Sequence, residues 1–171
     1  HQVAYAPDGD HLAGGLGGGT VRLWCPHSGA TSRILRGHTG PVLDVTYSPD
    51  GAHLASASQD HTVRIWDTRT GELLRTLVGH QSRVCGATYS PDGRNIVTAS
   101  EDWTARIWDA ATGTEQKKLI GHKSDVRSAV YSPDGTRILT ASNDRTARVW
   151  DARTGQLLFV LEGEHSDTVQ S

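Results

Sequence analysis

Apolar and polar residues alternate along the chain in short runs, and residues that favour turns separate one run from the next. The clearest runs are VLDVTYS (42–48), HLASAS (53–58), TVRIWD (62–67) and LLRTLV (73–78). Each is short and either rich in β-branched residues or alternating in polarity, as β-strands are. No window has apolar residues at i, i+3, i+4 and i+7 with helix caps at both ends. The pattern therefore predicts an all-β chain.

The separators between the runs predict tight turns. In the Ser-Pro-Asp-Gly sequence at 48–51, proline presets φ at one position of the turn, and glycine accepts a positive φ near its exit. Thr-Gly pairs end the connection between the third and fourth runs, at 70–71, 112–113 and 154–155. Short turns of this kind join neighbouring strands of an antiparallel sheet.

The whole set of runs recurs every 42 residues. This period is visible in the spacing of Tyr5, Tyr47, Tyr89 and Tyr131, and of Trp24, Trp66, Trp108 and Trp150. A fixed period of ~20–50 residues indicates a repeat architecture. We divide the chain into four units of four strands and a tail that leads to a further unit or a partner chain: 1–36, 37–78, 79–120, 121–162 and 163–171.

Some third strands carry large apolar residues on both sides, as Val63, Ile65 and Trp66 do. A sheet of that kind has to be covered on both faces by neighbouring sheets. Blades packed face to face around an axis satisfy this requirement, whereas a single open sheet does not.

Composition and charge exclude several classes of partner. Among 171 residues the net charge is −2, so no basic field attracts nucleic acid and no polybasic segment attracts a membrane surface. No run approaches the ~18 apolar residues of a membrane-spanning helix. Cys25 and Cys85 stand at different points of their units, which favours a reducing compartment, and we expect a cytoplasmic protein. Because the chain begins at His1 and has no methionine, we expect an excerpt, a processed product or a trimmed chain.

The Gly-His pairs at 37–38, 79–80 and 121–122, followed by YSPDG, AS-x-D and T-x-R-[IV]-W-D, resemble the WD-repeat β-propellers along nearly the whole chain. The resemblance implies a β-propeller of four-stranded antiparallel blades, four in this chain. It also implies a buried network in each blade, formed by His38, Ser56, Asp60 and Trp66, by His80, Thr98, Asp102 and Trp108, and by His122, Thr140, Asp144 and Trp150. In each, the aspartate orients the imidazole, the imidazole bonds a hydroxyl, and the hydroxyl accepts from the indole N–H, so every buried polar group has a partner.

The first unit departs from this pattern. Gly14 replaces the hydroxyl residue, Gly18 replaces the aspartate, and Cys25 follows Trp24 where an aspartate is expected. We therefore expect the first blade to be degenerate and to lack the network.

Four blades lie at the low end of the ~4–8 found in propellers. In the tail, His165 stands close to the place of a fifth Gly-His, and His1 continues the approach to a first strand. We expect two chains to join tail to head as a homodimer and close an eight-bladed ring with twofold symmetry. The alternatives are an open portion of a larger parent protein and a four-bladed monomer.

Three motifs suggest chemistry that their context does not favour. The repeated Ser/Thr, His and Asp suggest a hydrolase triad, but the sets recur at the structural period and each includes the tryptophan. The run GGLGGG (14–19) suggests a phosphate loop, but no Lys-Ser/Thr follows it and no helix starts there. The remaining histidines lack the short spacing of metal ligands. We therefore expect no enzyme activity, no metal and no cofactor.

The resemblance implies that the face bearing the turns before the first strand and between the second and third strands binds other proteins. The corresponding positions are Leu43, Cys85 and Arg127 at the start of the first strand, and Gln59, Glu101, Asn143, His61, Trp103 and Arg145 at the turns. Tryptophan and arginine are enriched among interface anchors. Trp103 therefore suggests a contact residue, unless it only packs on an adjacent turn. Arg127 suggests a group that meets an acidic side chain, unless it is simply solvated.

We interpret the sequence as a non-catalytic scaffold that presents a rigid face to another protein or peptide of unknown identity. One alternative is a sensor or regulatory module of a larger bacterial signalling protein, such as a kinase or an NTPase-type receptor. Another is an engineered or reconstructed propeller made to study how propellers assemble.

Overall fold

A computed structural model describes residues 2–162 as sixteen β-strands arranged in four sheets of four antiparallel strands. The first sheet comprises β1 (Val3–Tyr5), β2 (Leu12–Gly15), β3 (Thr20–Trp24) and β4 (Thr31–Arg36). The second comprises β5 (Val42–Tyr47), β6 (His53–Ser58), β7 (Thr62–Asp67) and β8 (Leu73–Val78). The third comprises β9 (Val84–Tyr89), β10 (Asn95–Ser100), β11 (Thr104–Asp109) and β12 (Glu115–Ile120). The fourth comprises β13 (Val126–Tyr131), β14 (Arg137–Ser142), β15 (Thr146–Asp151) and β16 (Leu157–Glu162).

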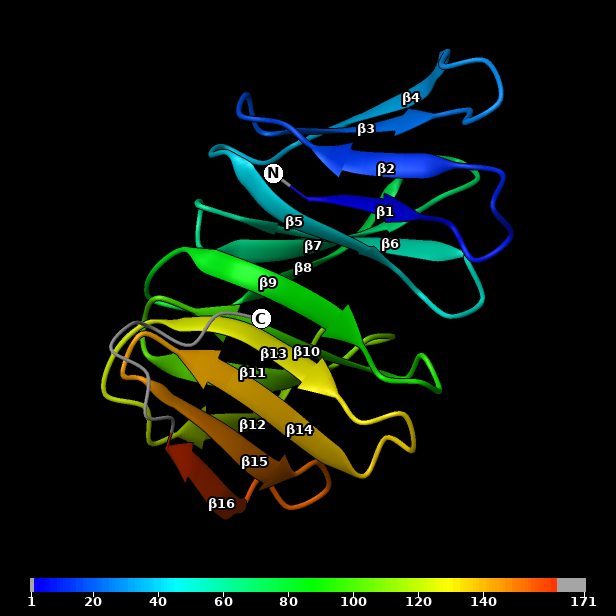
Figure 1. The fold of residues 1–171 in the computed structure, drawn as a ribbon. Coiled ribbons are helices and arrows are strands. Elements are labelled where there is room, and N and C mark those ends of the chain that lie inside the picture. Colours follow the sequence, from blue (N-terminus) through cyan, green and yellow to red (C-terminus); the bar gives the residue numbers. More distant parts are fainter. Residues whose placement is uncertain (1, 163–171) are drawn as a thin grey trace.

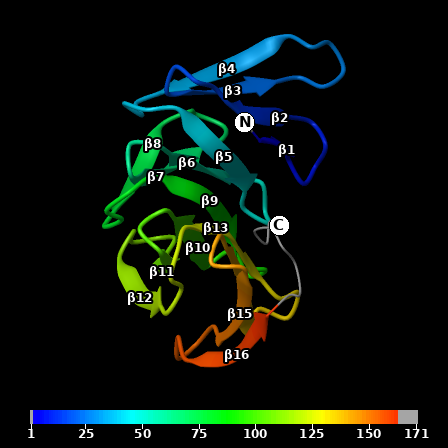
Figure 2. The same ribbon diagram turned by 60° about the vertical axis from the view of Figure 1, so that its left-hand side comes forward.

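Each sheet is a meander in which strands that follow one another in sequence lie side by side. The first strands β1, β5, β9 and β13 contact one another in succession, so they form the inner side of the assembly, and β4, β8, β12 and β16 lie on its outer side. The sheets follow one another in an arc, with the first and fourth sheets at opposite ends (Figures 1 and 2). The all-β repeat architecture predicted from the sequence is confirmed.

Within residues 2–162, three apolar cores lie between consecutive sheets. In the second sheet, Trp66 joins the core shared with the first sheet, whereas Val63 and Ile65 join the core shared with the third. This arrangement explains why β7 carries large apolar residues on both sides. Each sheet thus has two different apolar faces, one for the preceding sheet and one for the following sheet.

The turns take the conformations that their sequences favour. In the Ser-Pro-Asp-Gly turns, Gly51 has φ of +72°, and the Asp50 carboxylate accepts the Ser48 hydroxyl at 2.5 Å and the Ala52 N–H at 3.0 Å. In residues 2–162 no helix occurs that is long and apolar enough to span a membrane. The expected join between chains rests on His1 and the tail at 163–171, which lie outside the described residues.

Candidate functional site

A chain of hydrogen bonds runs through the second sheet from a turn to a buried indole. The His38 Nδ1–H donates to the Asp60 carboxylate at 2.7 Å, and His38 Nε2 lies 2.8 Å from the Ser56 hydroxyl. The Trp66 Nε1–H donates to the same hydroxyl at 2.8 Å. Asp60 also accepts from the backbone N–H of Thr39 and from both the backbone and the side chain of Thr62. The two oxygens of one carboxylate therefore tie a loop, a turn and a strand together.

The third and fourth sheets repeat this chain. The corresponding distances lie between 2.7 and 2.9 Å for His80, Asp102, Thr98 and Trp108, and for His122, Asp144, Thr140 and Trp150. The structure therefore brings together all twelve residues that the resemblance assigns to buried networks.

Burial keeps the imidazole of the network neutral, and hydrogen bonds keep its carboxylate charged. Burial lowers the pKa of His38, and the bond to Asp60 offsets this only in part. Burial on its own would raise the pKa of Asp60, but hydrogen bonds from Thr62, His38 and Thr39 outweigh it and hold that pKa below its ordinary value. The result is a neutral imidazole that donates through Nδ1 and accepts through Nε2.

The geometry does not suit nucleophilic catalysis. A nucleophilic hydroxyl has to reach a substrate, but Ser56, Thr98 and Thr140 are each 0% exposed. Each of these hydroxyls is also held between an imidazole and an indole. The three sets therefore act as clamps inside the blades, and the described residues contain no group of three or more His, Cys, Asp or Glu placed to hold a metal ion.

The first sheet has no such network among its described residues. A Cβ on Gly14 would lie 2.9 Å from the Trp24 ring, so the indole occupies the space that a hydroxyl side chain would need. At the third turn Cys25 stands where Asp67 elsewhere accepts a backbone N–H, from Thr70 at 2.6 Å. Gly14 and Cys25, two of the three departures expected from the sequence, therefore occupy the positions that the repeat assigns to them.

The first strands of the second, third and fourth sheets each carry a β-bulge near their start, and further bulges lie between the third and fourth strands at the opposite end of the blades. Val42 pairs with Ser58 and Asp44 with Ala57, so Leu43 is the extra residue of a bulge at the start of β5. The same shift makes Cys85 the extra residue in β9 and Arg127 the extra residue in β13. Bulges bend a strand and re-aim a side chain, and they are over-represented beside functional sites.

The turns at the same end hold three residues in a left-handed conformation. His61, Trp103 and Arg145 have φ of 70°, 69° and 69°. In the first sheet this position is Gly19, with φ of 73°, which glycine adopts without strain. Non-glycine residues are disfavoured there by about 1–2 kcal/mol. All three side chains are exposed, and Trp103 is 53% exposed.

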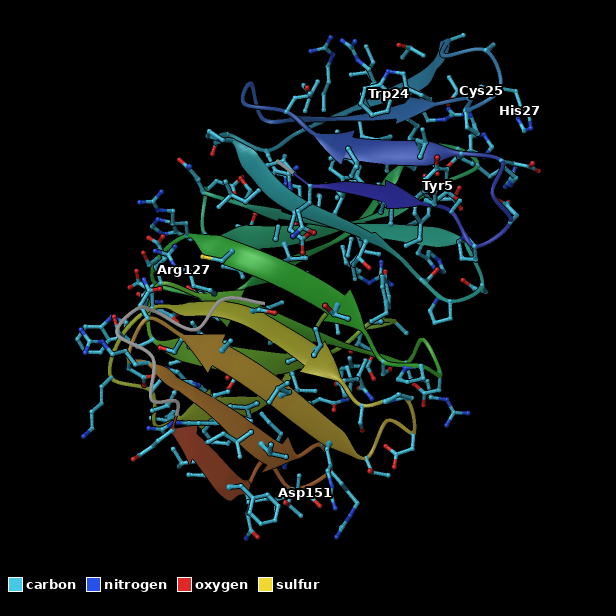
Figure 3. The ribbon with its side chains drawn as sticks, in the orientation of Figure 1. Tyr5, Trp24, Cys25, His27, Arg127 and Asp151 are labelled. Atoms are coloured by element: carbon cyan, nitrogen blue, oxygen red, sulfur yellow. The ribbon has the colours of Figure 1, made fainter. Side chains whose placement is uncertain are left out.

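We call this end of the blades the bulge surface and define it by nine residues: Leu43, Gln59, His61, Cys85, Glu101, Trp103, Arg127, Asn143 and Arg145. Figure 3 shows Arg127 at this end, and Cys25, His27 and Asp151 at the opposite end of the strands.

A charged cluster joins the third and fourth sheets on the bulge surface. The Arg127 guanidinium donates to Glu101 at 2.8 Å, lies 3.2 Å from the Asp125 carboxylate, and donates to the Asn143 amide oxygen at 3.2 Å. Arg83 pairs with the same Glu101 at 2.7 Å. Arg127 therefore meets acidic groups of its own chain, which hold its guanidinium in one orientation.

Two members of this cluster, Arg83 and Asp125, are absent from the residues singled out in the sequence. They occupy the same position of successive units, where the second unit has Pro41. When the units are aligned, this position changes from proline to arginine to aspartate, just before the first strand. That variation is the sequence signal that identifies Arg83 and Asp125. Their role depends on contact between two blades, which the spacing within one blade does not show.

A cavity recurs at the opposite end of the blades, between each pair of consecutive described sheets, and a further one of about 430 Å³ lies beside Arg145 on the bulge surface. Between the second and third sheets this cavity has a volume of about 440 Å³ and is lined by Ile65 and Leu74 of the second sheet and Tyr89 of the third. Equivalent cavities contain Tyr47 and Tyr131, and all three tyrosine hydroxyls are buried without a hydrogen-bond partner among the described residues. Because the cavity recurs at every such contact, we assign it to the repeat and not to one specialised site.

The family model "WD domain, G-beta repeat" matches the chain four times, over residues 1–25, 29–67, 71–109 and 113–151. A search of curated proteins gives no match.

Proposed function

The chain belongs to the WD domain, G-beta repeat family, and we propose that it is a non-catalytic scaffold that binds another protein or peptide through the bulge surface. Repeats of this family are typically protein-interaction scaffolds. A net charge of −2 supports a protein partner over nucleic acid or an anionic membrane.

The observation that carries the proposal is the conformation of the turn tips. Three blades hold His61, Trp103 and Arg145 at positive φ, although Gly19 of the first blade shows that glycine fits this position. Strain of this kind concentrates at functional positions, where the side chain has a use that offsets it. The tips differ in chemistry from blade to blade, since they are an imidazole, an indole and a guanidinium, while the networks beneath them scarcely change.

Rigidity gives the surface its mechanism. The aspartates of the networks hold the turns that carry the tips, since Asp102 accepts both the backbone N–H and the hydroxyl of Thr104, the residue after Trp103. The ion pairs of Arg127 fix a second position beside them. A partner that binds groups already fixed loses less conformational entropy, so more of the contact energy appears as affinity.

The proposal includes a larger ring. Four blades in an open arc leave the first and fourth sheets with one neighbour each, and a second copy of the chain would complete an eight-bladed ring with twofold symmetry. Such a ring presents the bulge surface twice.

A random peptide display library selected on the immobilised chain tests the function. We expect the selected peptides to bind the wild type and to lose at least tenfold in affinity for Trp103→Ala and for Arg127→Gln. The matched control is Arg153→Gln, an exposed arginine at the opposite end, which should leave affinity unchanged. Peptides that bind all three variants alike would contradict the proposal, because their site would lie outside the bulge surface.

A further inference from the structure

Each contact between consecutive sheets, which we call a seam, joins two different faces. At the seam between the first and second sheets, the first sheet contributes Ala13, Val21, Leu23 and Leu35, and the second sheet contributes Val45, Tyr47, Leu54 and Trp66. We call these the Leu face and the Tyr face. The other two seams are built from the equivalent residues. Every sheet therefore has one Leu face and one Tyr face, and each seam pairs a Leu face with a Tyr face.

The ends of the arc leave one face of each kind uncovered. The first sheet exposes its Tyr face, on which Tyr5 is 69% exposed, whereas the equivalent Tyr47 and Tyr89 are 8% and 7% exposed. The fourth sheet exposes its Leu face, on which Leu161 is 51% exposed, against 2% or less for the equivalent residues of the other sheets. Figure 3 shows Tyr5 and Trp24 on the first sheet, at the end of the arc opposite β16.

Close contacts across the seams identify which residues of the two open faces would meet. A Cβ on Gly71 or Gly113 would lie 3.2 or 3.4 Å from the leucine of the preceding sheet, and Gly155 repeats this contact with Leu119 at 3.4 Å. The fourth member of this glycine series, Gly29, has nothing within 4 Å. The fourth leucine of the series is the exposed Leu161.

Contacts between glycine and proline across the seams also show which residues of the two open faces would meet. A Cβ on Gly51 would lie 3.4 Å from Pro7, and Gly93 and Gly135 repeat this contact with the proline of the preceding sheet at 3.5 and 3.6 Å. The remaining glycine, Gly9, has nothing within 4 Å, and the remaining proline, Pro133, is exposed. Both series therefore lack only the contact between the fourth sheet and the first.

The outer strand of the fourth sheet is also more apolar than its equivalents. β16 reads LLFVLE and exposes five apolar side chains, whereas β12 reads EQKKLI. Phe159 stands where Lys117 packs against Gly155, so it extends the Leu face at the level of Gly29. Soluble proteins seldom leave an apolar patch of this extent in water.

We propose that the Leu face of the fourth sheet packs on the Tyr face of the first sheet of a second copy, in the register of the internal seams. This inference rests on the larger ring of the proposed function and specifies its interface. A second copy fits as the partner because each chain exposes one Leu face and one Tyr face. The three internal seams already pair a face of one kind with a face of the other. Two copies then form two identical seams and leave no face open, whereas pairing like faces would set tyrosine against tyrosine.

Absolute mass from light scattering coupled to size exclusion tests the proposal. We expect a mass near twice 18.4 kDa for the wild type, and a folded chain of 18.4 kDa for Tyr5→Lys and for Leu161→Glu. The matched control is Ile120→Glu. Ile120 is 69% exposed on β12, and the fourth sheet has Glu162 at the same position, so this variant should stay dimeric. Circular dichroism reports whether each variant is folded.

Mixing the Tyr5→Lys and Leu161→Glu monomers tests the direction of pairing. One seam of the mixed dimer is native, and the other carries both the introduced lysine of one chain and the introduced glutamate of the other. Head-to-tail packing therefore predicts that the doubled mass returns. Pairing of like faces predicts no recovery, because both of its seams keep a defect.

A folded wild type of 18.4 kDa, or a dimer that Leu161→Glu leaves intact, would overturn the proposal. The selected peptides should still bind the folded Leu161→Glu monomer, because the bulge surface lies away from the Leu face. Failure of the seam and failure of the bulge surface are therefore distinguishable.

Discussion

At the residue scale, the hydroxyl in the middle of each network is the hydrogen-bond partner of both the imidazole and the indole. Thr98 is 0% exposed, accepts the Trp108 indole N–H at 2.9 Å and lies 2.7 Å from His80 Nε2. Neither the indole nor the imidazole can turn to water from this position. The cost of losing the hydroxyl is therefore the cost of two buried polar groups without partners.

Thr98→Val removes the hydroxyl while keeping the shape of the side chain. We expect the free energy of unfolding in urea to fall by about 1–3 kcal/mol for each of the two groups left unpaired. Thr76→Val is the control, because Thr76 is exposed on β8 and should change stability by less than about 0.5 kcal/mol. Equal stability for the two variants would show that the networks do not hold the blades together.

Asp44 gives the fold a dependence on pH that the networks do not share. Its carboxylate accepts the Ala87 N–H of the next sheet at 3.0 Å, and burial raises its pKa to about 6 although this bond and the Val45 N–H lower it. The folded state therefore holds a proton more tightly than the unfolded state does. The stability that this group contributes is full below pH ~4 and is lost as the pH rises towards 6.

Asp44→Asn removes this titration and retains an oxygen to accept the Ala87 N–H. Relative to the wild type, the variant should gain stability between pH 4 and pH 7, by as much as about 3 kcal/mol. Denaturant unfolding of both proteins at the two pH values measures the change. Subtracting the free energy of unfolding of the wild type from that of the variant removes the titrations of the network histidines and aspartates, which both proteins share. If this difference does not change with pH, Asp44 is not the source of the pH dependence.

At the element scale, Gly15 at the end of β2 and Gly18 in the turn before β3 are glycines for two separate physical reasons. A Cβ on Gly15 would lie 2.6 Å from Val42 Cγ1 and 2.9 Å from the Val42 carbonyl oxygen, so β2 and β5 approach too closely for a side chain. Gly18 has nothing within 4 Å. Gly15 allows β2 to pack closely against β5. Gly18 stands where the other blades have a network aspartate.

Alanine at these two positions separates the reasons. Gly15→Ala should lower the free energy of unfolding by about 1–3 kcal/mol, as overpacking does. Gly18→Ala should leave it unchanged or raise it by up to about 1 kcal/mol, because the unfolded chain loses freedom. Thermal unfolding measures both changes, and similar losses for the two variants would contradict the close approach of β2 and β5.

The strands and turns were predictable because alternation and turn chemistry are local properties of the sequence. The bulges were not, because Leu43 or Cys85 becomes an extra residue only in relation to the strand that it pairs with. The sequence therefore placed these residues at the start of their strands without showing that they are turned out of the ladder.

At the scale of the whole molecule, the network bonds within each blade and the apolar seams follow the period, whereas some polar contacts between blades do not. The bond between His80 and Asp102 could be predicted because both residues belong to one repeat. The ion pair of Arg127 with Glu101 joins two repeats, and so does the bond from Asp44 to the Ala87 N–H. These contacts depend on how one sheet is rotated against the next, which no motif records.

The groups that stabilise the fold are different from the groups proposed to bind a partner. Networks and seams hold the blades through buried groups that repeat from blade to blade, whereas the tips of the bulge surface are exposed and differ in every blade. A change at a tip should therefore alter binding without loosening the fold.

Trp103→Gly tests this claim most directly, with peptide affinity and thermal unfolding measured on one sample. Glycine accepts the φ of 69°, so we predict stability equal to the wild type or higher by up to about 1 kcal/mol. We predict that affinity for the selected peptides falls at least tenfold, or about 1.4 kcal/mol. Unchanged affinity with lower stability would contradict the account, because Trp103 would then be a packing residue and not a contact for a partner.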